Sequence, residues 1–207
     1  MAFVKNTVAA TVTQDERKQP RNFEDMVAQL HDANPVARRW AARDLSYYPE
    51  ASAALVGRLR LEQEPSVRGV IFTTLTRLGG PVAVAGLTAC LRTDDAALRN
   101  EAIEAMKSLP DEMAPIVQKL LVDPDSDVRI FAVNILEALN HPATESWLID
   151  VIDRDSQVNV CSAALDLLAE VGTRASVESV TRLKNHFGGE PYIQFSAALV
   201  LKRLGQD

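Results

Sequence analysis

Three aspartates at alternate positions, Asp123, Asp125 and Asp127, are the side chains of this 207-residue chain whose spacing comes nearest to metal chemistry. An EF-hand calcium loop opens with this alternation, but it also needs a glycine at its sixth position and a bidentate acid at its twelfth. The chain has Val128 and Asn134 at those two positions. We therefore interpret Asp123, together with Asp94, Asp111 and Asp155, as an acid that caps a turn or helix start, and we expect no metal.

The histidines and cysteines are too dispersed to form a reactive centre. His31, His141 and His186 lie in distant parts of the chain, and no two have the spacing that places a pair of ligands on one helix face. Cys90 and Cys161 fall inside predicted helices, so we interpret them as small core side chains. We predict no catalytic residue, no cofactor and no enzymatic activity.

Two further features bear on location. A pair of cysteines without a disulfide framework is typical of a reducing compartment, so a cytoplasmic location is expected. No apolar run approaches the roughly 18 residues that a membrane-spanning helix needs, so no membrane association is expected.

The apolar spacing predicts short paired helices. Residues 113–140 form two amphipathic stretches on either side of a turn at residues 123–125. A helix pair of this length cannot bury its own apolar face, so it must pack against similar pairs.

Such pairs recur at steps of 30 to 33 residues, as the spacing of one apolar position shows. That position is occupied by Ala37, Val67, Leu98, Val128, Val160 and Ile193. Four residues later come Ala41, Ile71, Ala102, Ala132, Ala164 and Ala197, and eight residues later come Leu45, Leu75, Met106, Leu136, Leu168 and Leu201. Small side chains allow close helix approach and large ones fill the space beside them. The pattern predicts an all-α solenoid of units at about 22–49, 50–79, 80–110, 111–140, 141–172 and 173–207.

Residues 1–21 precede the first unit and are predicted to form a flexible N-terminal arm, because they combine three threonines with a highly polar stretch. An alternative uses valines spaced four apart as a segment that caps the first unit or folds onto a partner.

The turn of the fourth unit, residues 123–129 with the sequence DPDSDVR, resembles the turn of a HEAT repeat in the short bacterial form of phycobilisome-lyase-type proteins. The resemblance implies a right-handed α-solenoid of about six HEAT-like helical hairpins. In that family an acid and an arginine six residues apart form a ladder between successive turns. The resemblance implies this role for Asp32, Arg38, Glu62, Arg68, Arg99, Asp123 and Arg129. The fifth and sixth units depart from it, since Asp155 is kept but Cys161 and Gln194 replace the arginine.

The resemblance also leaves alternatives to weigh. HEAT-like deoxyhypusine hydroxylases use repeated His-Glu dyads, and no histidine here is followed by a glutamate. HEAT-like DNA glycosylases are basic and use an aromatic cleft, whereas this chain has a net charge of −6 and its two tryptophans, Trp40 and Trp147, lie in distant units. A bilin lyase-like chromophore chaperone subunit stays open as an alternative function.

Charge favours a protein partner over nucleic acid. Residues 93–170 carry 5 Lys and Arg against 16 Asp and Glu, a net of −11. A phosphate backbone would be repelled there, whereas a basic protein patch would be attracted. The first unit does interleave Arg38, Arg39 and Arg43 with Trp40, Tyr47 and Tyr48 in its predicted second helix, which is typical either of nucleic-acid contacts or of packing at the end of the solenoid.

We predict that the second helices line the concave face and bind a protein there, so that the chain acts as a non-enzymatic scaffold or adaptor. The predicted binding residues are Arg39, Arg43, Thr73, Asn100, Glu104, Lys107, Asn134, Glu137, Phe195 and Leu199. Phe195 and Leu199 are apolar at positions expected to face solvent. They are interpreted as a cover for the open end, a partner contact or a homodimer contact through the C-terminal unit.

Overall fold

The structure is a computed structural model that describes residues 21–205. Twelve α-helices and three short 3₁₀ helices follow one another in this range, which contains no strand. They are α1 (Phe23–Gln29), α2 (Pro35–Asp44), η1 (Leu45–Tyr47), η2 (Pro49–Ala51), α3 (Ser52–Leu59), α4 (Pro65–Leu78), α5 (Gly80–Cys90), α6 (Ala96–Lys107), α7 (Pro110–Leu120), α8 (Ser126–Leu139), α9 (Thr144–Arg154), α10 (Val158–Val171), η3 (Arg174–Ser176), α11 (Val177–His186) and α12 (Pro191–Arg203). None of these helices has the length and apolar character that crossing a bilayer requires.

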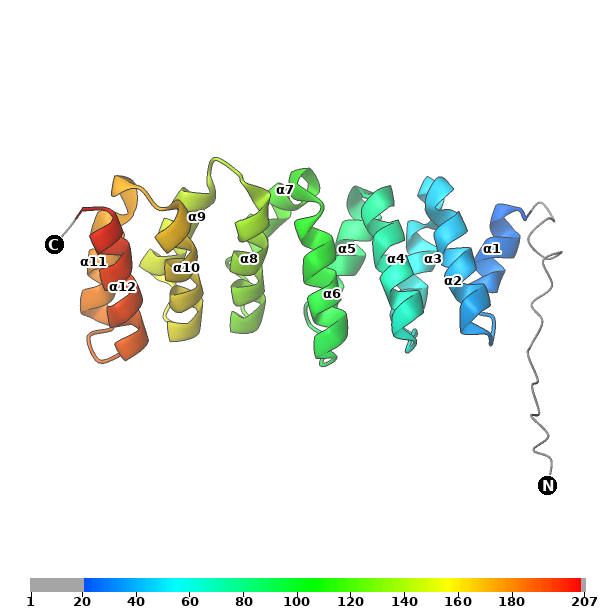
Figure 1. Cartoon of the computed structure of the whole chain (residues 1–207), viewed down its shortest axis with the longest axis horizontal. Coiled ribbons are helices and arrows are strands. Elements are labelled where there is room, and N and C mark those ends of the chain that lie inside the picture. Colours follow the sequence, from blue (N-terminus) through cyan, green and yellow to red (C-terminus); the bar gives the residue numbers. More distant parts are fainter. Residues whose placement is uncertain (1–20, 206–207) are drawn as a thin grey trace, which may run out of the picture.

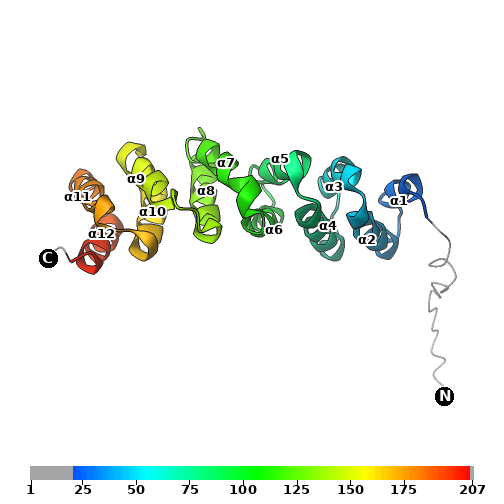
Figure 2. The ribbon, with the colours of Figure 1, turned by 90° about the horizontal axis from the view of Figure 1, so that it is seen from above.

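The helices stack in file as six pairs, and the described ends of the chain lie at opposite ends of the stack (Figure 1). The odd-numbered helices form one layer and the even-numbered helices form the other (Figure 2). Each even-numbered helix packs on the next even-numbered helix and on the odd-numbered partner that precedes it in the chain. The predicted all-α solenoid of six helical hairpins is confirmed.

The predicted core positions are buried, which confirms the repeat register. All six side chains at the second position, from Ala41 to Ala197, are 0% exposed. The third position is buried from Leu45 to Leu168, whereas Leu201 is half-buried, as is Ala37 at the first position. The predicted N-terminal arm lies outside the described residues, except for Arg21, which donates to Gln29 Oε1 at 2.6 Å.

Polar side chains and prolines begin the even-numbered helices. Asp125 Oδ1 accepts a hydrogen bond from the amide of Asp127 at 2.9 Å, and Asp123 Oδ1 accepts one from the amide of Asp125 at 3.0 Å. These bonds satisfy donors that a helix start leaves unpaired. Asp125 is thus the capping residue of α8, while Asp123 is bonded in the turn before it, and α6 is capped by Asp95 instead of the predicted Asp94. Residues 21–205 contain no group of three His, Cys, Asp or Glu side chains that could hold a metal ion.

The end of the second helix in unit one differs from the prediction. The α-helix ends at Asp44 and continues as the 3₁₀ turn η1, so the placement of Tyr47 and Tyr48 in that helix was wrong. Tyr48 is extended, with φ −122° and ψ 99°, because the ring of Pro49 disfavours a helical conformation in the residue before it.

Candidate functional site

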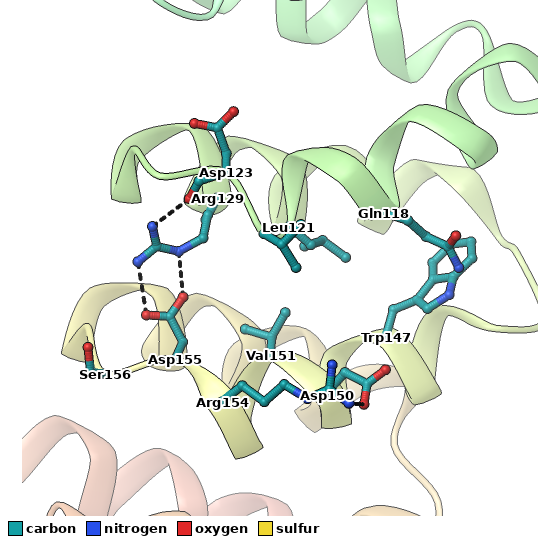
Figure 3. Close-up of a pocket in the computed structure, with 11 residues that line it drawn as sticks. Gln118, Leu121, Asp123, Arg129, Trp147, Asp150, Val151, Arg154, Asp155 and Ser156 are labelled. Carbon is teal, nitrogen blue, oxygen red and sulfur yellow. Dashed lines mark hydrogen bonds and ion pairs between the residues drawn. The ribbon is translucent and has the colours of Figure 1, made fainter.

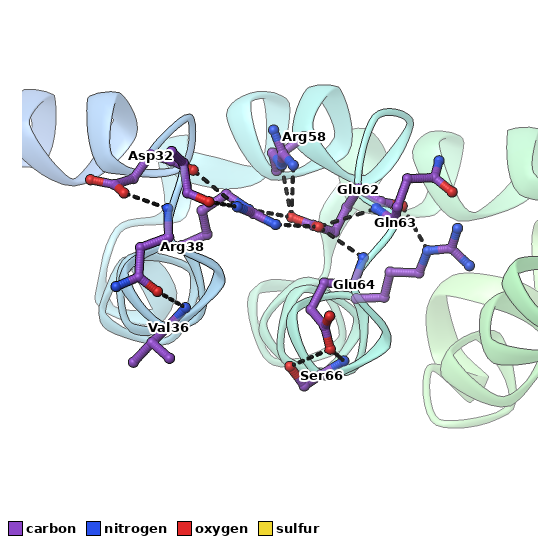
Figure 4. Close-up of polar contacts among 11 residues, drawn as sticks. Asp32, Val36, Arg38, Arg58, Glu62, Gln63, Glu64 and Ser66 are labelled. Atoms are coloured by element: carbon purple, nitrogen blue, oxygen red, sulfur yellow. Dashed lines mark hydrogen bonds and ion pairs between the residues drawn. The ribbon is translucent and has the colours of Figure 1, made fainter. Parts of the chain in front are cut away.

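The ladder between turns begins at Arg38 (Figure 4). Its Nε and Nη2 donate to the two carboxylate oxygens of Glu62 at 2.8 and 2.7 Å, and its Nη1 donates to the backbone oxygen of Asp32 at 3.0 Å. The arginine therefore pairs with the acid of the next unit, while its own unit supplies a carbonyl oxygen. This bidentate geometry is the strong form of an arginine–carboxylate contact.

Glu62 is the most deeply buried acid of the ladder, at 1% exposure. It accepts hydrogen bonds from Arg38, from Arg58 at 2.9 Å, and from the amides of Gln63 and Glu64 at 3.1 and 3.0 Å. Burial favours the neutral acid, but the bonds from Arg38, the Glu64 amide and Arg58 outweigh it and lower the pKa of Glu62 from 4.5 to about 2.

In two further rungs of the ladder, an arginine likewise binds a backbone oxygen of its own unit and an acid of the next unit. Arg68 donates to the backbone oxygen of Glu62 at 2.8 Å and pairs with Asp95 of the third unit, also at 2.8 Å. Arg129 pairs with Asp155 of the fifth unit at 2.6 and 3.0 Å. Successive turns are thus joined by charge-assisted hydrogen bonds as well as by apolar packing.

In the third unit, Arg92 forms the ion pair with the acid of the next unit in place of the predicted Arg99. Arg99 donates to the backbone oxygen of Thr93 at 2.7 Å, and its guanidinium lies over the ring of Phe131 at 5.2 Å. Its Nε is buried without a hydrogen-bond acceptor. Arg92, which the sequence analysis did not single out, forms the ion pair with Asp123 at 2.5 Å.

Neutral groups replace the arginine in the last two units. Cys161 Sγ donates to the backbone oxygen of Asp155 at 3.4 Å, and Gln194 Nε2 donates to the backbone oxygens of Lys184 and Phe187 at 2.6 and 3.1 Å. Both side chains keep the contact within their own unit. Within the described residues, the row of ion pairs ends at Asp155.

The helices α2, α4, α6, α8, α10 and α12 lie in one layer (Figure 2), and we call the surface formed by their exposed side chains the even-helix face. The structure places every predicted binding residue on it. Exposed are Arg39, Arg43, Thr73, Asn100, Glu104, Asn134, Glu137, Phe195 and Leu199, and Lys107 is half-buried.

Two acids and one lysine meet at the centre of the even-helix face. Lys107 Nζ lies 3.2 Å from Glu104 and 3.8 Å from Glu137, which belongs to the next unit. The side chains of Glu104 and Glu137 are 71% and 60% exposed. One cation is shared between two acids, so this part of the surface keeps a net negative charge.

Two of the aromatic rings of unit one have contacts within that unit. The guanidinium of Arg43 lies 4.0 Å above the ring of Trp40, and the ring of Tyr48 lies 5.5 Å from that of Phe23. Both interpretations of this cluster, end packing and nucleic-acid contact, stay predictions.

A groove of about 620 Å³ opens on the even-helix face between α4 and α6. Thr73, Asn100 and Glu104 of the predicted surface line it, together with Glu101, which the sequence analysis missed. The sequence could have pointed to Glu101, because this acid occupies a position that is apolar or small in the other units.

A second groove, of about 480 Å³, lies in the other layer between α7 and α9 (Figure 3). Its apolar lining includes Trp147, and the ring of His141 is stacked on Trp147 with 4.6 Å between centroids. Its charges are paired within the chain, as in the contact of Arg154 with Asp150 at 3.2 Å. The groove exists because α7 and α9 barely touch, and a single sequence does not reveal that spacing.

An apolar stripe runs along the exposed side of α12. Tyr192, Phe195 and Leu199 are 53%, 68% and 50% exposed. The hydroxyl of Tyr192 donates to Asp166 Oδ2 of α10 at 2.8 Å. This bond ties the start of the stripe to the even-helix face of the fifth unit.

The chain is similar to one known protein family and to several solved structures. A family model described as HEAT repeats matches residues 23–107 and 113–202. No curated protein matches the chain.

Solved structures of helical repeat proteins are similar to the chain. An engineered protein is 17% identical over 90% of this chain and 97% of its own, with a TM-score of 0.44. A computationally designed armadillo repeat protein for modular peptide recognition is 16% identical over 87% and 99%, with a TM-score of 0.43. The complex of CpcE and CpcF of phycocyanin lyase from Nostoc sp. PCC7120 is 18% identical over 97% and 99%, with a TM-score of 0.37. Since the family model covers both halves of the solenoid, the chain belongs to the HEAT-repeat family.

Proposed function

We propose that this chain is a non-enzymatic scaffold or adaptor that binds another protein, one with a basic patch, on the even-helix face. The observation that carries the proposal is the negative centre of that face, where Glu104 and Glu137 stay largely exposed and share Lys107. Like charges held in a row attract an oppositely charged partner and speed its association at low salt.

The solenoid supports this function physically. The ladder and the buried core fix successive units against each other, so the exposed side chains of six helices are presented as one continuous surface. A pre-organised surface loses little conformational entropy when it binds.

Charge reversal tests the proposal. Glu104→Lys combined with Glu137→Lys is expected to abolish capture of a basic partner from a lysate of the native host, with bound proteins identified by mass spectrometry. Asp150→Lys is the matched control, because Asp150 is a helical acid of similar exposure, 59%, in the opposite layer. Calorimetry with the purified partner then measures the affinity. Equal affinity of the partner for wild type, for the double variant and for Asp150→Lys contradicts the proposal.

The alternative of a bilin lyase-like chromophore chaperone stays a prediction from the sequence resemblance. A coloured complex on mixing the chain with a bilin and an apo-phycobiliprotein would favour it over a pure scaffold. Nucleic-acid binding is the least favoured alternative, and salt-dependent binding to DNA is the result that would support it.

A further inference from the structure

Glu101 breaks the pattern of the side chains that face the preceding unit. It is the third residue after the first core position of α6, and the corresponding residues are Trp40, Val70, Phe131, Ala163 and Ser196. Val70, Phe131 and Ala163 are half-buried and pack against the core. A carboxylate in this row is held against α4 instead of in open solvent.

One oxygen of that carboxylate lacks a partner. Glu101 Oε2 is buried and accepts no hydrogen bond from any group in the described part of the chain. Burial raises the pKa of Glu101, and the nearby charge of Asp95 adds to the rise while that of Arg68 opposes it. Arg68 itself is engaged by Asp95 and by the backbone oxygen of Glu62, both at 2.8 Å. A buried acceptor without a donor is unfavourable, so a ligand that brings a donor gains affinity here.

The groove between α4 and α6 gives access to Glu101. A methyl group at Gly69 would meet no atom within 4 Å, so the wall formed by α4 is open at that point. The hydroxyl of Thr73 donates to the backbone oxygen of Gly69 at 2.8 Å and is therefore satisfied. The terminal torsion of a glutamate is broad, so the carboxylate can turn its unpaired oxygen into the groove.

The neighbouring cations are occupied elsewhere. Arg77, which also lines the groove, lies with its guanidinium 5.0 Å above the ring of Tyr47 in the first unit. Lys107 is shared between Glu104 and Glu137. The groove therefore presents Glu101, which forms no ion pair with any described residue, beside Glu104, which is largely exposed and shares Lys107 with Glu137.

We propose that this groove binds an arginine side chain of a partner protein, with Glu101 and Glu104 as its carboxylate acceptors. A guanidinium suits the site because it is permanently charged, is weakly hydrated and offers several N–H donors in one plane. The inference rests on the proposed function, since the arginine belongs to the partner that the even-helix face binds.

A peptide with one arginine tests the site directly. The probe is a capped pentapeptide of glycine and alanine with a central arginine, titrated into isotope-labelled protein and followed by NMR. Wild-type protein is expected to show shifts confined to α4 and α6. Glu101→Gln keeps the shape and removes the charge, and it should weaken binding by about tenfold or more. Asp150→Asn removes one charge from an exposed helical acid in the opposite layer and should change the affinity by less than about twofold.

Two further measurements make the outcome decisive. The same peptide with a central lysine should bind more weakly than the arginine peptide. Because Oε2 has no donor in the free chain, Glu101→Gln should leave the thermal unfolding midpoint unchanged or raise it. Equal binding by wild type and Glu101→Gln, no binding by wild type, or a clear fall in the midpoint of Glu101→Gln each overturns the inference.

These results are separate from the test of the proposed function. If the arginine peptide fails while reversal of Glu104 and Glu137 still abolishes partner capture, the arginine site is wrong and the scaffold function stands. If the peptide binds as expected while the reversed variant still captures the partner, the scaffold function is wrong.

Discussion

Replacement of Glu62 by glutamine should remove a large part of the stability that the solenoid loses in acid. In the folded chain the pKa of Glu62 is lowered from 4.5 to about 2, and the side chain is 1% exposed. A lowered pKa contributes stability that is complete above pH 4.5 and is lost as the pH falls toward 2. A difference of about 2.5 pKa units corresponds to about 3 kcal/mol of unfolding free energy.

The assay is urea unfolding of wild type and Glu62→Gln at a series of pH values from about 7 to about 2. At neutral pH the variant should be about 3 kcal/mol less stable, because Arg38 and Arg58 lose the carboxylate charge that they share. The two stability curves should converge below pH 4.5, where wild type loses the contribution of Glu62. Glu137→Gln, a change at a 60% exposed side chain, should follow wild type throughout. Parallel curves for wild type and Glu62→Gln would refute the reasoning.

Two other predictions concern packing and association. Gly86→Ala should destabilise the chain by about 1–3 kcal/mol, because a Cβ there would lie 2.3 and 2.8 Å from the two methyl groups of Val56. Gly57→Ala, where a Cβ meets nothing within 4 Å, should instead be about 0.5–1 kcal/mol more stable than wild type. The melting temperatures of the two variants are measured by circular dichroism, and equal values would contradict the close approach of α5 to α3. Phe195→Ser with Leu199→Ser should abolish self-association in analytical ultracentrifugation, and a wild-type chain that is monomeric at every concentration would rule out the predicted homodimer.

The fold was predictable because each unit buries apolar residues at the same positions of its second helix. A buried alanine such as Ala132 and a large residue four positions later recur with little variation, so their spacing reveals both the helices and the face that packs. The rung from Arg38 was also recognisable from its resemblance to a known turn, although the acid that it binds belongs to the following unit.

The grooves were not predictable in the same way. Arg92 replaces Arg99 in the third rung because Arg92 starts from the turn after α5 and Arg99 from α6, and their reach depends on how units three and four are placed. The importance of Glu101 likewise depends on the absence of a donor from α4, which no local pattern encodes. Distances between neighbouring units decide these features, whereas a single sequence mainly reports what happens within one unit.

Units four and five contact each other mainly through α8 and α10, because α7 and α9 are separated by a gap. On either side of it the outer helices touch, as α5 touches α7 and α9 touches α11, while α8 and α10 stay in contact across it. Bending about this gap would change its width with little loss of contact between α7 and α9, and it would also strain the ion pair of Arg129 with Asp155, which joins the two turns. A partner that contacts the stack on both sides of this gap would hold the angle between the two parts.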